Sequence, residues 1–405
     1  MSDIDETDKS TRKQRLYTLL AFFLLGLCNN FGYVVMLSSA HDILKNLSPP
    51  NNQTGNSTIH NQSDEHARDC NHLSTGVILL ADILPGLMVK MISPFIPLYI
   101  NRRICVCLGL TVASFLTVAR AKTEFVATIG VALTSLASGL GEPTLLAYMS
   151  YFDRNAITTW SSGTGAAGIL GALTYVGLTG ILQLTPSTTM YLMLVVPFVM
   201  AFSFWVLLVH PDLDAVHTIT DSADSLSDST RKTADTFAGK LSYLPSLIKF
   251  MLPLGMVYFF EYLINQGLFE LVYFRNIWLT HAEQYRWYQV LYQVGVFVSR
   301  STVSLFPIEK LWILAILQGI NLIYFLTQTV YSFTPNIFIV FVIIAYEGLL
   351  GGSGYVNTYH NIVKKVPKER REFAMSMTSL ADCLGITMAG FVAIPVHNAI
   401  CQLPV

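Results

Sequence analysis

Eight ionisable side chains interrupt long apolar stretches of the sequence, and these are the residues that could carry chemistry. They are six carboxylates and two bases: Asp82, Glu142, Glu261, Glu270, Glu347 and Asp382, with Lys90 and Arg300. An ionisable group inside a membrane is costly and by default marks a functional pathway. Unpaired carboxyl groups in a low dielectric also take up protons readily. The pattern therefore favours a solute pathway and leaves proton coupling open.

Glu261 and Glu347 fall close to the middle of their apolar stretches, and polar residues accompany both at helical spacing. The first stretch aligns Tyr258, Glu261, Tyr262 and Asn265. The second aligns Glu347, Gly351, Gly354, Thr358 and Asn361, with Asn357 and His360 beside them, and a third aligns Gln289, Gln293, Val296 and Arg300. Residues at this spacing share one helical face. The three faces predict a wet cavity, with a purely structural polar network as the alternative.

The two bases lead to different expectations. Arg300 is the best candidate for binding an anionic substrate, because a guanidinium matches phosphate or carboxylate through two parallel hydrogen bonds. Pairing with an embedded carboxylate is an equally open alternative for Arg300. Lys90 lies near the end of its apolar stretch, so we expect it to extend to the membrane surface. For Asp82 and Glu270, structural and functional roles stay open.

The elements that must position these groups are membrane-spanning helices. The chain has 405 residues, 52% hydrophobic and 13% charged, with a net charge of −1 and a mean hydropathy of +0.49. A soluble domain has about 25% charged residues, so this composition argues against a soluble enzyme, a disordered chain or a nucleic-acid binder. A run of about 20 apolar residues crosses the bilayer as a helix. Eleven such segments are predicted, at 17–39, 74–96, 104–119, 125–150, 156–183, 189–209, 247–273, 286–305, 311–330, 336–361 and 373–396.

Glycosylation motifs and basic residues predict the orientation of these segments. Four N-x-S/T motifs cluster in one polar stretch, at Asn46, Asn52, Asn56 and Asn61. Such a cluster is typical of a glycosylated luminal loop. Most Lys and Arg residues fall in the alternate loops, which agrees with a cytosolic N-terminus by the positive-inside rule. Eleven crossings would then place the C-terminus in the lumen.

The segments divide into two halves. We predict a cytosolic tail at 1–16, a six-helix bundle at 17–209 with the luminal loop 40–73, a cytosolic linker at 210–245 and a five-helix bundle at 246–405. Two helical bundles joined by a cytosolic loop are the layout of major-facilitator transporters. The predicted fold class is therefore an all-α membrane protein, a major-facilitator-like bundle of about 11 transmembrane helices.

Other motifs give no sign of an enzyme. Gly163, Gly165 and Gly168 match the G-x-G-x-x-G dinucleotide fingerprint, but that motif requires a preceding strand. Gly163, Ala167 and Gly171 instead recur every four residues, which favours close helix packing. The nine His and six Cys residues form no recognisable metal or disulfide framework. No cofactor, metal or nucleic-acid partner is predicted.

Several long motifs resemble those of a known family. They are Leu25–Leu37, Ala40–Leu44, Leu79–Pro85, Ser138–Glu142, Trp160–Gly165, Glu261–Leu271, Gln284–Gln289, Tyr346–Gly352, Tyr355–Thr358 and Arg371–Met375. From about residue 20 to its end, the chain is similar to the battenin family, the lysosomal membrane proteins of Batten disease. The resemblance implies a major-facilitator-like fold of 11 helices in late endosomal and lysosomal membranes.

The resemblance also implies that the protein exports small lysosomal solutes, with glycerophosphodiesters as the best-supported class. Arginine transport, regulation of lysosomal pH, autophagy and trafficking are further associations, so a basic amino-acid transporter and a membrane scaffold remain alternatives. From polarity and helix phase within the matched motifs, we place eight residues around the cavity: Glu142, Glu261, Asn265, Gln266, Gln293, Arg300, Glu347 and His360.

The C-terminus departs from the family pattern. Family members carry a Cys four residues from the end, which implies prenylation, whereas this chain ends in Cys401-Gln-Leu-Pro-Val405. That is one residue too long for the prenylation motif, and the predicted C-terminus is luminal. We therefore predict that Cys401 is not prenylated. The lysosomal location rests on the resemblance, because the linker 210–245 has no clear sorting signal.

Overall fold

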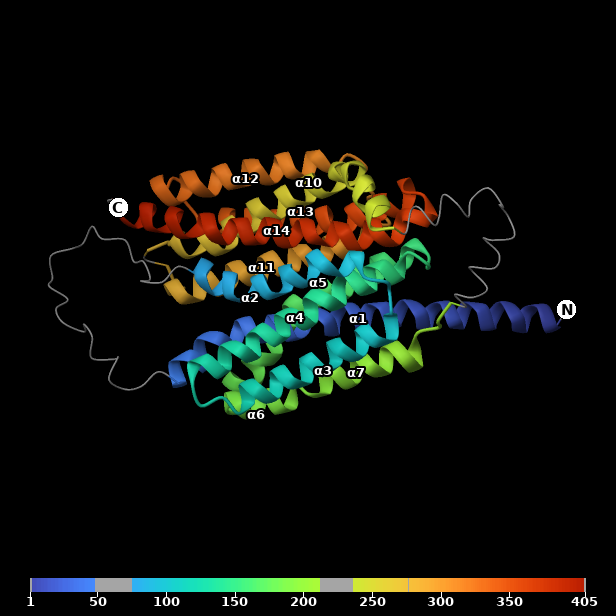
Figure 1. Ribbon diagram of the computed structural model, residues 1–405. Helices are drawn as coiled ribbons and strands as arrows, with labels where there is room; N and C mark the ends of the chain where they lie inside the picture. Colours follow the sequence, from blue (N-terminus) through green and yellow to red (C-terminus); the bar gives the residue numbers. More distant parts are fainter. Residues whose placement is uncertain (1, 48–74, 212–235, 276, 404–405) are drawn as a thin grey trace.

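The computed structural model describes residues 2–47, 75–211, 236–275 and 277–403, which form a bundle of helices (Figure 1). The N-terminal half contains α1 (Ser2–Leu47), α2 (Thr75–Ile92), α3 (Ile100–Ala119), α4 (Glu124–Met149), α5 (Arg154–Val176), α6 (Pro186–Leu192) and α7 (Val195–Phe202). The C-terminal half contains α10 (Phe237–Gly267), α11 (His281–Ser301), α12 (Leu311–Tyr331), α13 (Ile337–Lys365) and α14 (Lys368–Cys401). Two short 3₁₀ helices are η2 (Ser93–Phe95) and η5 (Phe269–Leu271), and two short π-helical segments are η3 (Gly177–Ile181) and η4 (Ser203–Leu207).

The predicted all-α fold is confirmed. Each of the eleven predicted segments coincides with helix, and 189–209 is divided between α6, α7 and η4. Eight helical segments in the described parts of the chain are long and apolar enough to cross a membrane. The stretches of α2, α5 and α11 are not among those eight. For α5 and α11 the reason is composition, since α5 is rich in Gly, Ser and Thr and α11 carries several Gln and Tyr residues.

Some predicted features lie wholly or partly outside the described residues. Asn46 lies near the end of α1, whereas Asn52, Asn56 and Asn61 lie outside the described residues. Most of the predicted linker 210–245 is likewise outside them, and α10 already begins at Phe237. Glycosylation and the linker stay predictions.

Polar caps determine where several helices begin. The hydroxyl of Thr236 accepts a hydrogen bond from the Gly239 amide at 3.1 Å, at the start of α10. Thr280 and Glu283 form a reciprocal capping box at the start of α11. These side chains satisfy backbone amides that have no partner within the helix. The two helices that present Glu261 and Arg300 thus have defined starting points.

The two halves meet along a few helices. Within the N-terminal half, α1 packs against α5, and α3 against α4; within the C-terminal half, α10 packs against α14, and α11 against α13. Across the boundary, α14 lies against α2 and α4, and α11 lies against α5 (Figure 1). Embedded charges on α2, α4, α11 and α14 are therefore brought to the contact between the halves.

Glycines allow the closest of these helix contacts. A Cβ atom on Gly163 of α5 would overlap the backbone of Phe23 in α1, and one on Gly171 would press on Val34. The predicted stripe of small residues is thus confirmed as a packing surface against α1. On another face of α5, Gly165 lies against Phe297 of α11. The dinucleotide interpretation is excluded because this segment is a helix packed on both sides.

We expect Gly139→Ala to destabilise the protein. A Cβ atom there would lie 2.8 Å from the carbonyl oxygen of Gly86, where α4 crosses α2. Overpacking of this kind costs about 1–3 kcal/mol, so the melting temperature of the purified protein in detergent should fall. Gly109→Ala is the matched control, because a Cβ at Gly109 meets no atom within 4 Å. Equal melting temperatures of Gly139→Ala and Gly109→Ala would contradict the close contact between α4 and α2.

The termini lie at opposite ends of the bundle (Figure 1). At the N-terminal end, the halves are joined by direct contacts. The Phe95 ring lies 5.1 Å from that of Phe237 and 5.8 Å from that of Phe373. The hydroxyl of Tyr151 donates to Glu372 at 2.5 Å. We call Phe95, Phe237, Phe373, Tyr151 and Glu372 the N-terminal-end contact.

Candidate functional site

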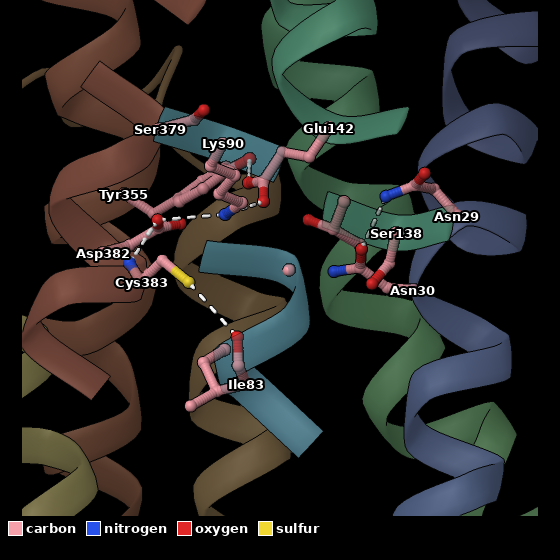
Figure 2. A network of polar contacts seen from close by, with 12 residues as sticks. Asn29, Asn30, Ile83, Lys90, Ser138, Glu142, Tyr355, Ser379, Asp382 and Cys383 are labelled. Carbon is pink, nitrogen blue, oxygen red and sulfur yellow. Dashed lines mark hydrogen bonds and ion pairs between the residues drawn. The ribbon is translucent and has the colours of Figure 1, made fainter. Parts of the chain in front are cut away.

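Lys90 of α2 connects the two halves. Its ammonium lies 2.6 Å from Glu142 Oε2 of α4 and 3.1 Å from Asp382 Oδ1 of α14 (Figure 2). The exposed fractions of the three side chains are 8%, 13% and 6%. We call these three residues the Lys90 triad. The expectation that Lys90 extends to the membrane surface is wrong, because its two partners hold it between the helices.

Tyr355 of α13 links the triad to a second cation. Its hydroxyl donates to Glu142 Oε1 at 2.6 Å and lies 3.2 Å from the indole nitrogen of Trp160, which donates to it. The guanidinium of Arg300 lies over the Tyr355 ring, 4.4 Å from its centre. Such a cation–π contact is favourable when water is excluded. Tyr355 therefore lies between the two embedded bases. Its hydroxyl bonds to Glu142 of the Lys90 triad, and its ring contacts the Arg300 guanidinium.

Arg300 of α11 makes hydrogen bonds to neutral oxygens. Its Nη1 donates to the Thr164 hydroxyl at 2.7 Å, and its Nη2 donates to the Tyr258 hydroxyl at 2.9 Å. The Nε atom has no hydrogen-bond partner among the described residues, although Arg300 is only 9% exposed. In the described parts of the chain, no carboxylate lies within 4.0 Å of this guanidinium. We call Arg300, Thr164, Tyr258 and Tyr355 the Arg300 site.

Two of the predicted site carboxylates, Glu261 and Glu347, lie within the C-terminal half. Glu261 of α10 is 1% exposed and accepts a hydrogen bond from the Tyr292 hydroxyl, while its Oε2 has no partner among the described residues. A Cβ atom on Gly351 would overlap this carboxylate, so Glu261 lies against α13, one turn from Glu347. Glu347 is fully buried, and neither of its oxygens has a hydrogen-bond partner in the described structure.

The other predicted site residues spread along the same helices. Asn265 lies one turn beyond Glu261 on α10, is 3% exposed and has no described partner for its Oδ1. Gln266 follows it and is half-buried. Gln293 of α11 extends towards Gly168 of α5, across the contact between the halves. The structure does not place His360 with them, because it lies 13 residues beyond Glu347 on α13, about 20 Å along the helix.

Two predicted members of the polar face of α13 have structural partners. The Asn357 Oδ1 accepts from the Ile308 amide at 2.6 Å, and the Asn361 Nδ2 donates to the Ile308 carbonyl at 2.9 Å. Their side chains therefore hold the connection between α11 and α12 against α13. The assignment of Asn357 and Asn361 to a cavity wall is corrected by these bonds.

An ion pair beside this connection supplies a pH prediction. Glu309 bonds to Lys364 and lies 3.7 Å from Lys365. The hydrogen bond and charge of Lys364 lower the pKa of Glu309. A carboxyl whose pKa is lowered on folding stabilises the fold above its unfolded value of about 4.3. That contribution is lost as the pH falls through the lowered value.

We therefore expect hydrogen exchange at the Ile308 amide, corrected for its intrinsic pH dependence, to stay constant from neutral pH to about pH 5. Protection should decrease only in stronger acid. Glu309→Gln should weaken protection modestly at neutral pH, while Glu369→Gln serves as a control at another surface. Loss of protection already between neutral pH and about pH 5 would contradict the sign of this effect.

Sequence reasoning missed the residues that complete both cationic sites. The sequence marks Asp382 as an embedded carboxylate but does not place it in the site, and Tyr355 and Thr164 carry no charge that would mark them. The available signal was that a buried base requires charged or hydrogen-bonding partners inside the protein. No group of three or more His, Cys, Asp or Glu side chains in the described residues could hold a metal ion.

Comparisons with known proteins assign the family. A sequence model of the CLN3 protein family matches residues 20–235 and 216–403. Battenin from the dog is 42% identical over 432 aligned residues, which cover 99% of this chain and 97% of that protein. This chain belongs to the CLN3 (battenin) family. Protein btn-1 of Neurospora crassa is 33% identical, over 95% of this chain and 88% of that protein.

Solved structures identify the fold of this CLN3-family member. The human organic anion transporter MFSD10 superposes with a TM-score of 0.63 at 10% identity, covering 95% of this chain and 94% of that one. The Escherichia coli fucose:proton symporter superposes with a TM-score of 0.56 at 11% identity, covering 96% and 97%. At these identities the likeness shows the fold alone. The chain is a multi-pass membrane protein with a major-facilitator-type fold.

Proposed function

We propose that this protein is a transporter that exports glycerophosphodiesters from lysosomes and late endosomes by alternating access. The cargo binds between the two halves, where α11 and α5 bring the Arg300 site together. A fold of two helical bundles allows such a site to open towards one side of the membrane at a time. The function supports lysosomal homeostasis, and altered lysosomal pH or autophagy would follow indirectly from its loss.

The observation that carries this proposal is the set of groups that contact the buried Arg300 guanidinium. A buried arginine is normally paired with a carboxylate, yet the described partners of this one are two hydroxyls and an aromatic ring. A phosphodiester is an anion whose oxygens match the guanidinium fork. It would compensate the buried charge of Arg300. Thr164 and Tyr258 already hold the guanidinium between the halves.

Neighbouring polar groups suit the rest of such a cargo. Asn265 presents a carbonyl oxygen that has no hydrogen-bond partner among the described residues, and Gln293 extends across the contact between the halves. Amide side chains both donate to and accept from hydroxyl groups. We assign Asn265, Gln266 and Gln293 to the glycerol moiety. His360 lies too far along α13 to contact the cargo at the same time as these residues.

We infer that the N-terminus is cytosolic and the C-terminus luminal. The two ends of the bundle carry one terminus each (Figure 1). Cys401, at the end of α14, is disulfide-bonded. Disulfides persist in oxidising compartments and are rare in the cytosol. The bond also leaves no thiol for prenylation, which supports our prediction for Cys401.

With this orientation the N-terminal-end contact closes the cytosolic side of the pathway. We expect cysteines at Phe95 and Phe373, joined by a short thiol cross-linker, to block transport until the link is cleaved, because their rings lie only 5.8 Å apart. A Cys105→Ser background removes the exposed free thiol among the described cysteines. Each single cysteine variant is the control. Undiminished transport by the cross-linked protein would exclude opening at this contact.

The proposed cargo and location can be tested together in isolated lysosomes. Lysosomes without this protein should retain loaded radiolabelled glycerophosphoglycerol, and the wild-type chain should restore its efflux. Labelled arginine in the same lysosomes provides the comparison. Equal glycerophosphoglycerol efflux with and without the protein would contradict the proposal.

Export of arginine is the second candidate, and one observation favours it. Glu347 and Glu261 are buried, and three of their four oxygens have no described hydrogen-bond partner. Carboxylates could bind a cationic amino acid. The Arg300 guanidinium opposes this alternative by repulsion, since it lies at the contact between the halves. If lysosomes without the protein lose efflux of arginine but keep efflux of glycerophosphoglycerol, the second candidate is favoured.

A trafficking scaffold is the remaining alternative from the sequence. Such a role would depend on cytosolic segments rather than on the Arg300 site. Deleting 214–233, between the described ends of the two halves, separates the possibilities. Efflux from lysosomes that survives this deletion, together with lost lysosomal homeostasis, would support the scaffold.

A further inference from the structure

The Lys90 triad contains more negative than positive charge. One ammonium is shared by two carboxylates, Glu142 and Asp382. With all three groups ionised, the triad carries one net negative charge between tightly packed helices. An uncompensated buried charge is strongly unfavourable. Binding one proton at a carboxylate makes the triad neutral.

No second cation among the described residues bonds to either carboxylate of the triad, since Arg300 approaches Glu142 only through the Tyr355 side chain. The helices packed on α14 present to Asp382 the following titratable groups: Lys90 from α2, Glu142 from α4, Tyr258, Tyr262 and Glu261 from α10, and Tyr355 and Tyr359 from α13, with Cys383 next to it on α14. The 3₁₀ helix η2 contributes no titratable side chain. Lys90 is the one cation within this set.

The triad also spans the boundary between the halves. Lys90 and Glu142 belong to the N-terminal half, whereas Asp382 belongs to the C-terminal half. An ionised Asp382 attracts Lys90 and holds the halves together at this point. A protonated Asp382 loses that attraction, and Lys90 keeps Glu142 as its partner. Proton binding at Asp382 would therefore change a contact that alternating access has to break.

We propose that Asp382, within the Lys90 triad, is the binding site of a proton that is exported together with the anionic cargo. This inference rests on the proposed function and adds its driving force. One proton with one phosphodiester monoanion carries no net charge. The acidic lysosome then drives export, because a pH difference of one unit can sustain a concentration ratio of about tenfold for one proton per solute.

Reconstituted vesicles separate coupling from transport itself. The purified full-length protein is placed in liposomes with radiolabelled glycerophosphoglycerol, and two rates are compared. One is uptake driven by an imposed pH difference, and the other is exchange at equal pH. Asp382→Asn should reduce gradient-driven accumulation from about tenfold to near equality, while lowering exchange far less. Gradient-driven accumulation that survives Asp382→Asn overturns the proposal.

Two further variants distinguish proton binding from a structural ion pair. Glu142→Gln leaves the Lys90–Asp382 pair intact and electrically neutral, so it should also lose gradient-driven accumulation. A merely structural role predicts retained coupling. Ser379→Ala is the matched control one turn away, because the Ser379 hydroxyl bonds only to the Ser376 carbonyl among the described residues. It should leave both rates close to wild type.

Infrared spectroscopy tests the proton site without any cargo. Between neutral and lysosomal pH, the purified wild-type protein should gain a protonated carboxyl band that Asp382→Asn lacks and Ser379→Ala keeps. An unchanged band in Asp382→Asn overturns the assignment. If wild-type liposomes show no exchange of glycerophosphoglycerol, the proposed cargo fails, and the infrared band still decides whether Asp382 binds the proton.

Discussion

Arg300→Ala is expected to reduce transport of glycerophosphoglycerol at least about 30-fold, while the protein still reaches the membrane. Removing a buried charged partner costs about 2–5 kcal/mol, and each 1.4 kcal/mol corresponds to about tenfold. The reason is that no carboxylate of the described residues lies within 4.0 Å of Arg300, so its charge is available to the cargo. Initial rates in liposomes, divided by the amount of folded protein, give the measurement.

Two controls make this expectation specific. Arg286→Ala removes an exposed arginine near the other end of the same helix and should leave the rate unchanged. Thr164→Val removes one of the bonds that orient the guanidinium, so it should reduce the rate less than Arg300→Ala does. A wild-type rate in Arg300→Ala would remove Arg300 from the mechanism.

Lys90→Met is expected to cause the largest loss of stability. It leaves two buried carboxylates, Glu142 and Asp382, facing each other without their shared cation. Breaking a buried ion pair by removing one partner costs about 3–5 kcal/mol. The melting temperature of the purified protein and its yield as a single species in detergent should both fall clearly.

Neutralising the remaining partners should restore much of this loss. A triple variant with Lys90→Met, Glu142→Gln and Asp382→Asn contains no uncompensated charge in the triad. Replacing a buried ion pair as a whole is often neutral for stability. The triple variant should therefore melt well above Lys90→Met alone. If Lys90→Met instead melted at the temperature of the wild type, water would have to solvate Lys90, contrary to the structure.

The fold could largely be predicted from the sequence. Long apolar runs specify membrane helices almost without reference to their neighbours, since each must satisfy its own backbone hydrogen bonds. The stripe of Gly163 and Gly171 predicts a close helix contact because small residues let two helices approach each other, and the structure confirms this contact against α1. The short helices α6 and α7 were not separated, because the apolar composition continues across the break at Met193 and Leu194.

The candidate site could be predicted only in part. Charge and helix phase marked Arg300 and Glu261 as unusual, but they do not show which helices meet. Lys90 is separated by 52 residues from Glu142 and by 292 from Asp382, so its pairing depends on tertiary structure. Asn361 shares a face with Glu347, yet its partner is the Ile308 carbonyl of a connecting segment.

The most direct test of the central claim is exchange of glycerophosphoglycerol by the purified protein in liposomes. Vesicles loaded with unlabelled glycerophosphoglycerol should take up the labelled compound, and excess unlabelled arginine outside should not compete. The same vesicles with Arg300→Ala should show almost no uptake. Uptake of labelled arginine without uptake of glycerophosphoglycerol, or equal rates for wild type and Arg300→Ala, would contradict the assignment of an anionic cargo to Arg300.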